Sequence, residues 1–108
     1  MMHLTYTTDQ DNGQLTVRLN GELDLATADE LHDVLGTANV TTGVDTVNVD
    51  LDRVTFLDST TITELVTAAK AAQKSGRHLY ISHARGVVRH VLDLTGVLAA
   101  LSNRRHNN

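Results

Sequence analysis

Apolar and polar residues alternate along two segments near the start of the chain. Leu4 and Tyr6 alternate with polar residues, and the same period of two returns in residues 15–19, after a turn that contains Asn12 and Gly13. An Asn-Gly pair supplies the positive φ angles that tight hairpins require, and strict alternation is typical of strands with one buried face. The pattern therefore predicts two antiparallel strands joined by a hairpin.

Three later segments have the apolar spacing of amphipathic helices, in which hydrophobic residues recur three or four positions apart. The capping-box sequence from Thr27 to Glu30 predicts the start of the first helix. Glycines follow the second and third segments, as they often do at helix ends. The predicted helices cover about residues 28–38, 62–75 and 86–94.

Two further strands are predicted between these helices, at residues 47–51 and 78–82. The segment 97–101 fits a buried helical turn and an edge strand equally well, and residues from Arg104 onward read as a polar tail. The element order is therefore ββαβαβα. Right-handed crossovers then make the second, third and fourth strands parallel to one another, with the first strand antiparallel to the second.

Polar residues occupy one face of the predicted strands. Asn48 and Asp50 alternate with apolar residues in the third strand, as Thr16 and Arg18 do in the second. A parallel sheet that is covered on both faces would show continuous apolar runs instead. We therefore predict an α/β fold, with a four-stranded mixed sheet whose helices lie mainly on one face.

Composition limits what this fold can do. A chain of 108 residues with 41% hydrophobic residues forms one domain, 1–108, with an ordered core expected at about 3–102. Three aromatic residues, a net charge of −4 and no basic cluster argue against nucleic acid as a partner. The sequence has no cysteine, no apolar run long enough for a membrane span and no signal-peptide pattern, so we expect a cytoplasmic protein without membrane contact.

The polar side chains with reactive potential gather after the parallel strands. The connections 21–27, 53–61 and 82–86 all leave the carboxyl ends of strands, and each contains acidic, hydroxyl or basic groups. Loops at this edge are where such folds place function. We therefore expect the functional site at the carboxyl edge of the sheet.

The junction between the third strand and the second helix carries one carboxylate and three hydroxyls: Asp58, Ser59, Thr60 and Thr61. All four are good helix caps, and the capping-box spacing selects Thr61, which Glu64 follows three residues later. That start would leave Ser59 and Thr60 just upstream of the helix and near solvent. A phosphate there would meet unpaired N–H groups, but also the like charge of Asp58. The junction fits either an ordinary capped helix start, which is the commoner use of such residues, or a modification switch.

Other chemistry finds less support. The six histidines show no metal-ligand spacing, and no cysteines accompany them, so we expect no metal site. Asp50, Asp52 and Asp58 could suggest a cation or catalytic cluster, but no glycine-rich phosphate loop accompanies them, and a solvated sheet face is the favoured interpretation. Ser59 lacks the G-x-S-x-G elbow of a nucleophile, even with His83 at the same sheet edge. We expect no catalytic residues and no cofactor, and keep an anion on the open sheet as a weaker idea.

Three segments together resemble the anti-sigma-factor antagonist family of STAS domains: Gly21 to Asp24, Val49 to Thr60 and Val91 to Val97. They stand in the family's order and at its spacings, and the resemblance covers nearly the whole chain. It implies a STAS-like single domain and a small cytoplasmic regulator that is not an enzyme.

The resemblance also implies roles for individual residues. The family's phosphate acceptor falls on Thr60, with its neighbour Ser59 as the second choice. Asp58 matches the family's acidic residue at this site, and Asp24 matches a loop aspartate that faces the kinase. Thr61 stands where the family usually has glycine, and completes the expected partner-binding set.

The implied function is that of a partner switch in transcription. The unmodified antagonist binds an anti-sigma factor that is also a serine/threonine kinase, which frees a sigma factor. Phosphorylation at the start of the second helix ejects the antagonist, and a phosphatase acting on the phospho-form resets it. The alternative is a STAS subunit or scaffold that is never phosphorylated, in a lipid-transport or stress-signalling assembly.

Overall fold

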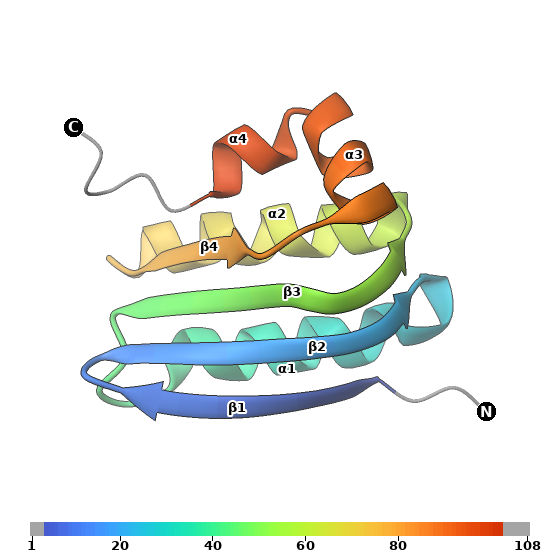
Figure 1. The fold of residues 1–108 in the computed structure, drawn as a ribbon. Helices are drawn as coiled ribbons and strands as arrows, with labels where there is room; N and C mark the ends of the chain where they lie inside the picture. The colour runs from blue at the N-terminus through green and yellow to red at the C-terminus, as the bar shows by residue number, and fades with distance from the viewer. Residues whose placement is uncertain (1–3, 103–108) are drawn as a thin grey trace.

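Four strands form one mixed sheet in the order β1-β2-β3-β4 (Figure 1). This computed structural model describes residues 4–102, so the tail predicted from Arg104 onward lies outside the described residues. β1 is antiparallel to β2, while β2, β3 and β4 are parallel, which confirms the predicted topology. The strands are β1 Thr5–Asp11, β2 Gln14–Leu23, β3 Thr46–Leu57 and β4 His78–Ser82.

The hairpin between β1 and β2 turns on Asn12 and Gly13. Their φ angles are 51° and 82° respectively, in the left-handed region that Asn and Gly tolerate best. The Asn-Gly pair therefore forms the turn of the hairpin, as predicted from the sequence.

Two long helices cover one face of the sheet, and of the two short helices that follow β4 the first contacts β3 and the second contacts β4 (Figure 1). The segment 97–101, for which a strand and a helical turn were both open, is a helical turn. Ser102 then makes an isolated parallel bridge with Ile81 of β4. The helices are the 3-10 helix η1 Leu25–Thr27, α1 Ala28–Val40, α2 Ser59–Lys74, α3 Gly86–Leu94 and α4 Val97–Leu101.

The core lies between the sheet and α1 and α2. Inward residues of β2 and β3 meet Leu31, Leu35 and Leu65 of the two helices, and these side chains are fully or almost fully buried. Each buried side chain of this size stabilises the fold by about 1.5–3 kcal/mol relative to exposure. α2 is thus firmly packed behind its first turn, which positions that turn at the carboxyl edge of the sheet.

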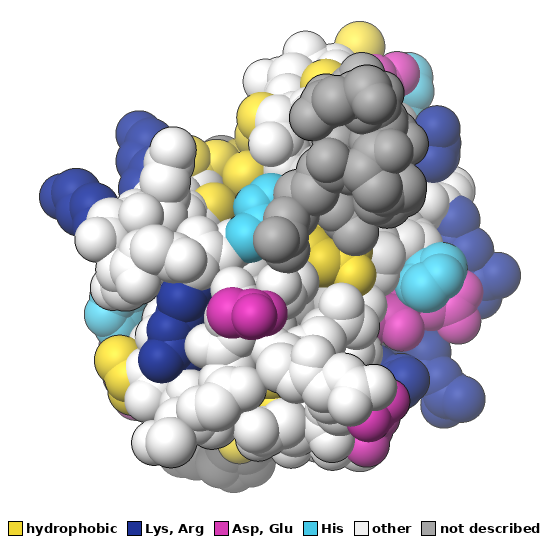
Figure 2. Space-filling model, turned by 90° about the vertical axis from the view of Figure 1, so that its left-hand side faces the viewer, with side chains coloured by type: hydrophobic (Ala, Val, Ile, Leu, Met, Phe, Trp, Pro, Cys, Tyr) yellow, Lys and Arg dark blue, Asp and Glu magenta, His cyan; other side chains and the backbone are white. Residues whose placement is uncertain are grey.

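The other face of the sheet is polar, as predicted. Ser82 Oγ donates a hydrogen bond to Asn48 Oδ1 at 2.7 Å, and the Tyr80 hydroxyl donates to Gln14 Oε1 at 3.2 Å. Figure 2 views the molecule from the end where the parallel strands begin; His, acidic and basic side chains lie together on the side of the open sheet face. Within residues 4–102 no helix is both long and apolar enough to span a membrane.

The third strand is longer than predicted. The sequence predicted a strand at 47–51 and a loop from 53, but β3 continues to Leu57. The β2–β3 register shifts between Arg18 and Asn20 and again between Gly21 and Glu22. These irregularities break the alternation that would reveal the strand, since Val54 and Leu57 are both buried three positions apart.

Candidate functional site

The carboxyl ends of β2 and β3 are joined at one point of the sheet edge. Leu23 is the register partner of Leu57, and the Asp58 N–H donates to the Leu23 carbonyl at 3.3 Å. The loop that begins at Asp24 therefore lies beside the start of α2. This contact brings together the acidic and hydroxyl groups of two segments that are more than 30 residues apart in the sequence.

Asp58 caps α2. Its Oδ1 accepts hydrogen bonds from the Thr61 N–H at 3.0 Å and from the Thr61 hydroxyl at 3.2 Å. The helix begins at Ser59, so the predicted capping box at Thr61 is wrong. β3 runs up to Leu57 and leaves Asp58 as the extended residue before the helix, where a carboxylate satisfies the orphan N–H of Thr61. Glu64, the predicted second half of the box, bonds His32 of α1 instead.

Ser59 and Thr60 occupy the first turn of α2 rather than a loop before it. Ser59 is exposed and Thr60 is half-buried. Within residues 4–102 neither side-chain hydroxyl takes part in a hydrogen bond. Thr61 is different: its side chain is fully buried against Asp58. Thr61 therefore shapes the site by fixing Asp58, and its own hydroxyl presents no surface to a partner.

Asp24 caps the neighbouring 3-10 helix. Its Oδ1 accepts from the Ala26 N–H at 2.9 Å, and the Thr27 hydroxyl oxygen accepts from the Asp24 N–H at 3.1 Å. Thr27 precedes α1 as its N-cap residue, as predicted, but its side chain forms no capping bond to α1. The predicted box from Thr27 to Glu30 is wrong in this respect, because Thr27 serves as the third residue of the box that Asp24 begins. Asp24 itself is half-buried, and α1 follows η1 without a break.

Three carboxylates lie at or beside the two caps without an ion-pair partner among the described residues: Glu22 at the end of β2, Asp24 and Asp58. One turn further along α2, Glu64 Oε1 lies 2.9 Å from His32 Nδ1. This hydrogen bond and the charge of Glu64 raise the pKa of His32, with smaller contributions from Asp33 and Asp29.

The third connection, 82–86, serves the open sheet face instead. His83 Nδ1 lies 3.3 Å from Asp50 Oδ1, and Arg85 Nε lies 3.4 Å from Asp52 Oδ1. Asp50 also pairs with Arg18 Nε at 3.6 Å, while Asp58 caps a helix, so the three carboxylates form no common cluster. Among residues 4–102 no group of three His, Cys, Asp or Glu side chains is arranged to hold a metal ion.

Two apolar side chains at the same edge were not predicted from the sequence. Leu25 of η1 and Phe56 of β3 are both exposed, although large apolar residues are usually buried. The register gives Phe56 the acidic Glu22 as its partner on β2. A break in alternation before Asp58 is the only sequence signal that could have indicated Phe56.

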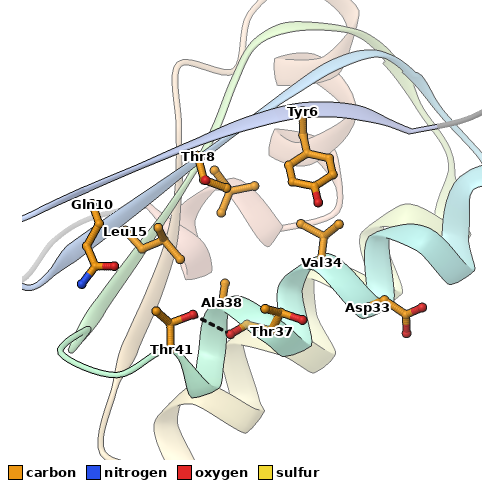
Figure 3. A pocket seen from close by; sticks show the side chains of 10 residues that line it. Tyr6, Thr8, Gln10, Leu15, Asp33, Val34, Thr37, Ala38 and Thr41 are labelled. Atoms are coloured by element: carbon orange, nitrogen blue, oxygen red, sulfur yellow. Dashed lines mark hydrogen bonds between the residues drawn. The ribbon is translucent and has the colours of Figure 1, made fainter.

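A pocket of about 420 Å³ lies between β1 and α1, away from these residues (Figure 3). Tyr6 of β1 and Val34 of α1 line it from opposite sides, with Thr37 and Thr41 further along the helix. The Thr41 hydroxyl donates to the Thr37 carbonyl at 2.8 Å. None of the pocket's lining residues belongs to the predicted partner-binding set.

A family model for the STAS domain matches residues 5–106. This chain belongs to the STAS domain family. The anti-sigma-B factor antagonist of Staphylococcus aureus strain NCTC 8325 is 30% identical over 96 residues, which cover 89% of this chain and 88% of the relative. The resemblance found in the sequence is thus confirmed, and this STAS domain stands with the anti-sigma-factor antagonists.

Solved structures share the fold of this STAS domain. An anti-sigma factor antagonist from Mycobacterium paratuberculosis is 25% identical, with a TM-score of 0.79 over 91% of this chain and 82% of that one. The Bacillus cell fate determinant SpoIIAA in its phosphorylated form is 18% identical, with a TM-score of 0.70 over 91% and 88% of the two chains. At that identity the likeness to SpoIIAA shows the fold alone.

Proposed function

We propose that this STAS domain is an anti-sigma-factor antagonist that binds an anti-sigma factor with serine/threonine kinase activity. Binding withdraws the anti-sigma factor from its sigma factor and so permits transcription. The observation that carries the proposal is the pair of unbonded hydroxyls, Ser59 and Thr60, on the first turn of α2. The name of the S. aureus relative and that of the M. paratuberculosis structure support the same assignment.

The switch is phosphoryl transfer to Thr60, with Ser59 as the second choice. The hydroxyl oxygen forms a bond to the γ-phosphorus of ATP, the bond to the β–γ bridging oxygen breaks, ADP leaves, and a base of the kinase takes the hydroxyl proton. Asp24, Asp58, Ser59 and Thr60 present the surface that the kinase contacts. Thr61 acts from beneath by holding Asp58 in place.

Phosphorylation dissociates the complex by electrostatic repulsion. A phosphate adds close to two negative charges beside Asp58, whose carboxylate is fixed by its two bonds from Thr61. In the interface these charges lose water and face the nucleotide and the carboxylates of the kinase site. A micromolar complex corresponds to about 8 kcal/mol, so a repulsion of a few kcal/mol is enough to dissociate it. A phosphatase that removes the phosphate restores binding.

Phosphopeptide analysis tests this proposal. The purified protein is incubated with each anti-sigma factor kinase of the source organism and ATP, and the peptide from Leu57 to Lys70 is examined by mass spectrometry with fragmentation. We expect one phosphate on the wild type, none on Thr60→Ala, and an unchanged yield on Ser59→Ala, which is the matched control one residue away.

Two results would overturn parts of the proposal. A phosphate that persists on Thr60→Ala and disappears on Ser59→Ala would assign the switch to Ser59. Binding of a partner without any phosphate on this peptide would favour the second candidate, a STAS subunit or scaffold that is never modified.

A further inference from the structure

The carboxyl edge of the sheet carries two exposed apolar side chains next to the switch. Leu25 in η1 is 73% exposed, and Phe56 near the end of β3 is 45% exposed. Both follow or precede a cap residue by one or two positions, since Leu25 comes after Asp24 and Phe56 comes before Asp58. Because large apolar side chains are usually buried, the exposure of both beside the proposed kinase-binding surface suggests that a partner covers them.

Leu25 and Phe56 lie within one interface's width of Thr60. Leu25 is two residues from Leu23, whose carbonyl accepts from Asp58, and Thr60 is two residues beyond Asp58. At about 3.5 Å per residue, this path keeps Leu25 within roughly 20 Å of Thr60, and Phe56 is four residues from Thr60 along the chain. A standard interface covers about 800 Å² on each partner, which spans roughly 30 Å.

We infer that Leu25 and Phe56 are the anchors by which the anti-sigma factor proposed above docks, so this inference rests on the proposed function. The partner presents an apolar socket to these two side chains. A few residues that lose all contact with water on binding usually carry most of the binding energy of an interface. Burial of the two anchors is independent of phosphate, so they supply affinity while Thr60 supplies regulation.

The acidic side chains beside Leu25 and Phe56 indicate which charges the partner carries around its apolar socket. Glu22 is the cross-strand partner of Phe56, and Asp24 directly precedes Leu25. Within residues 4–102 neither carboxylate has an ion-pair partner. The socket therefore carries lysine or arginine side chains on this side, away from the kinase groups that face Thr60.

Matched substitutions separate these anchors from other exposed apolar residues. Leu25→Ser is compared with Leu94→Ser, because Leu94 at the end of α3 is also 73% exposed. Phe56→Ser is compared with Tyr6→Ser, because Tyr6 on the edge strand β1 is also 45% exposed. The probe is the purified anti-sigma factor kinase that phosphorylates the wild type, and calorimetry gives Kd for each variant.

We expect Leu25→Ser and Phe56→Ser each to raise Kd at least tenfold, and both controls to stay within twofold of the wild type. In phosphorylation kinetics the anchor variants should raise KM and leave kcat unchanged, as expected when binding common to ground and transition states is lost. Thermal unfolding checks the fold of each variant. Leu25 lies outside the sheet. If Phe56→Ser does not fold, the Kd of Leu25→Ser alone therefore decides whether the proposed anchors bind the kinase.

The two proposals fail in different ways. If the wild type binds and is phosphorylated but Leu25→Ser binds as well as Leu94→Ser, the anchors are wrong while the proposed function stands. If no anti-sigma factor of the source organism binds the wild type, the proposed function is wrong, and the docking surface assigned to that partner is overturned with it.

Discussion

Asp58 caps α2 and also places a negative charge beside the proposed phosphorylation site. One carboxylate oxygen accepts from both the backbone N–H and the hydroxyl of Thr61. Among the described residues, the side-chain hydroxyls of the adjacent Ser59 and Thr60 form no hydrogen bond. The carboxylate cannot swing away from a new phosphate without breaking two hydrogen bonds. The repulsion that we assign to the switch therefore comes from a fixed group and not from a mobile side chain.

The pKa of His32 reports on the charge of Glu64, which lies one turn beyond the candidate site in α2. The hydrogen bond from His32 to Glu64 raises the pKa of the imidazole, so we expect Glu64→Gln to lower that pKa toward its ordinary value. The raised pKa in the folded state means that the contact stabilises the fold at pH below the unfolded value, and that this contribution is lost as pH rises through the folded pKa. NMR titration of the His32 ring in wild type and variant measures both values.

The NMR signals of α3, a different helix, check that Glu64→Gln leaves the rest of the fold unchanged. A pKa of His32 that does not move in Glu64→Gln would contradict the assigned ion pair between α1 and α2.

At the scale of elements, the start of α2 is set by where β3 ends. The pairing of Leu57 with Leu23 carries the strand up to Asp58, so the cap falls on Asp58. The helix then packs through Leu65 and Ala72, both fully buried, and its first turn stays at the surface. The strand thus positions the hydroxyls, and the core holds them there.

Substitutions of Asp58 test this cap. Asp58→Ala removes the acceptor for the Thr61 N–H, and we expect it to lower the free energy of unfolding by about 1 kcal/mol. Asp58→Asn keeps an oxygen at the same place and should stay close to wild type, because Asn caps as well as Asp. Urea unfolding measures both variants.

Asp33→Ala is the control for these variants, since Asp33 is exposed on α1 and should change stability by no more than about 0.5 kcal/mol. The cap assignment would be wrong if Asp58→Ala unfolded at the same urea concentration as Asp33→Ala.

Local patterns predicted most elements but not their junctions. Alternation in β2 and the helical spacing around Leu31 and Leu65 located strands and helices, because burial on one face imposes those periods. At the start of α2, both Asp58 and Thr61 satisfy local capping rules. The choice between them depends on the pairing of Leu57 with Leu23, a long-range contact that no local pattern contains.

The exposure of Leu25 and Phe56 could not be predicted for a related reason. Apolar residues near a strand end or a helix start are read as core unless the tertiary structure shows otherwise. Tertiary packing buries Leu23 and Leu57 completely or almost so, while their neighbours Leu25 and Phe56 stay in contact with solvent. The hydroxyls of the candidate site, in contrast, were located correctly at the carboxyl edge.

At the scale of the whole molecule, parallel strands collect distant segments at one edge. Asp24 and Asp58 follow the ends of the neighbouring strands β2 and β3, at the right of Figure 1. The opposite end of the sheet holds the hairpin and no residue of the candidate site. In the proposed switch the kinase binds the same surface that it phosphorylates, and the phosphate then weakens further binding there.

Phosphate-dependent affinity tests the account most directly. Calorimetry with the purified anti-sigma factor kinase compares the unmodified protein, its Thr60-phosphorylated form, Thr60→Asp and Thr60→Ala. We expect the unmodified protein and Thr60→Ala to bind alike, and the phosphorylated form to bind at least tenfold more weakly, which is about 1.4 kcal/mol. Thr60→Asp should bind with intermediate affinity, since it adds only one charge. Equal affinity of all four forms would contradict the switch.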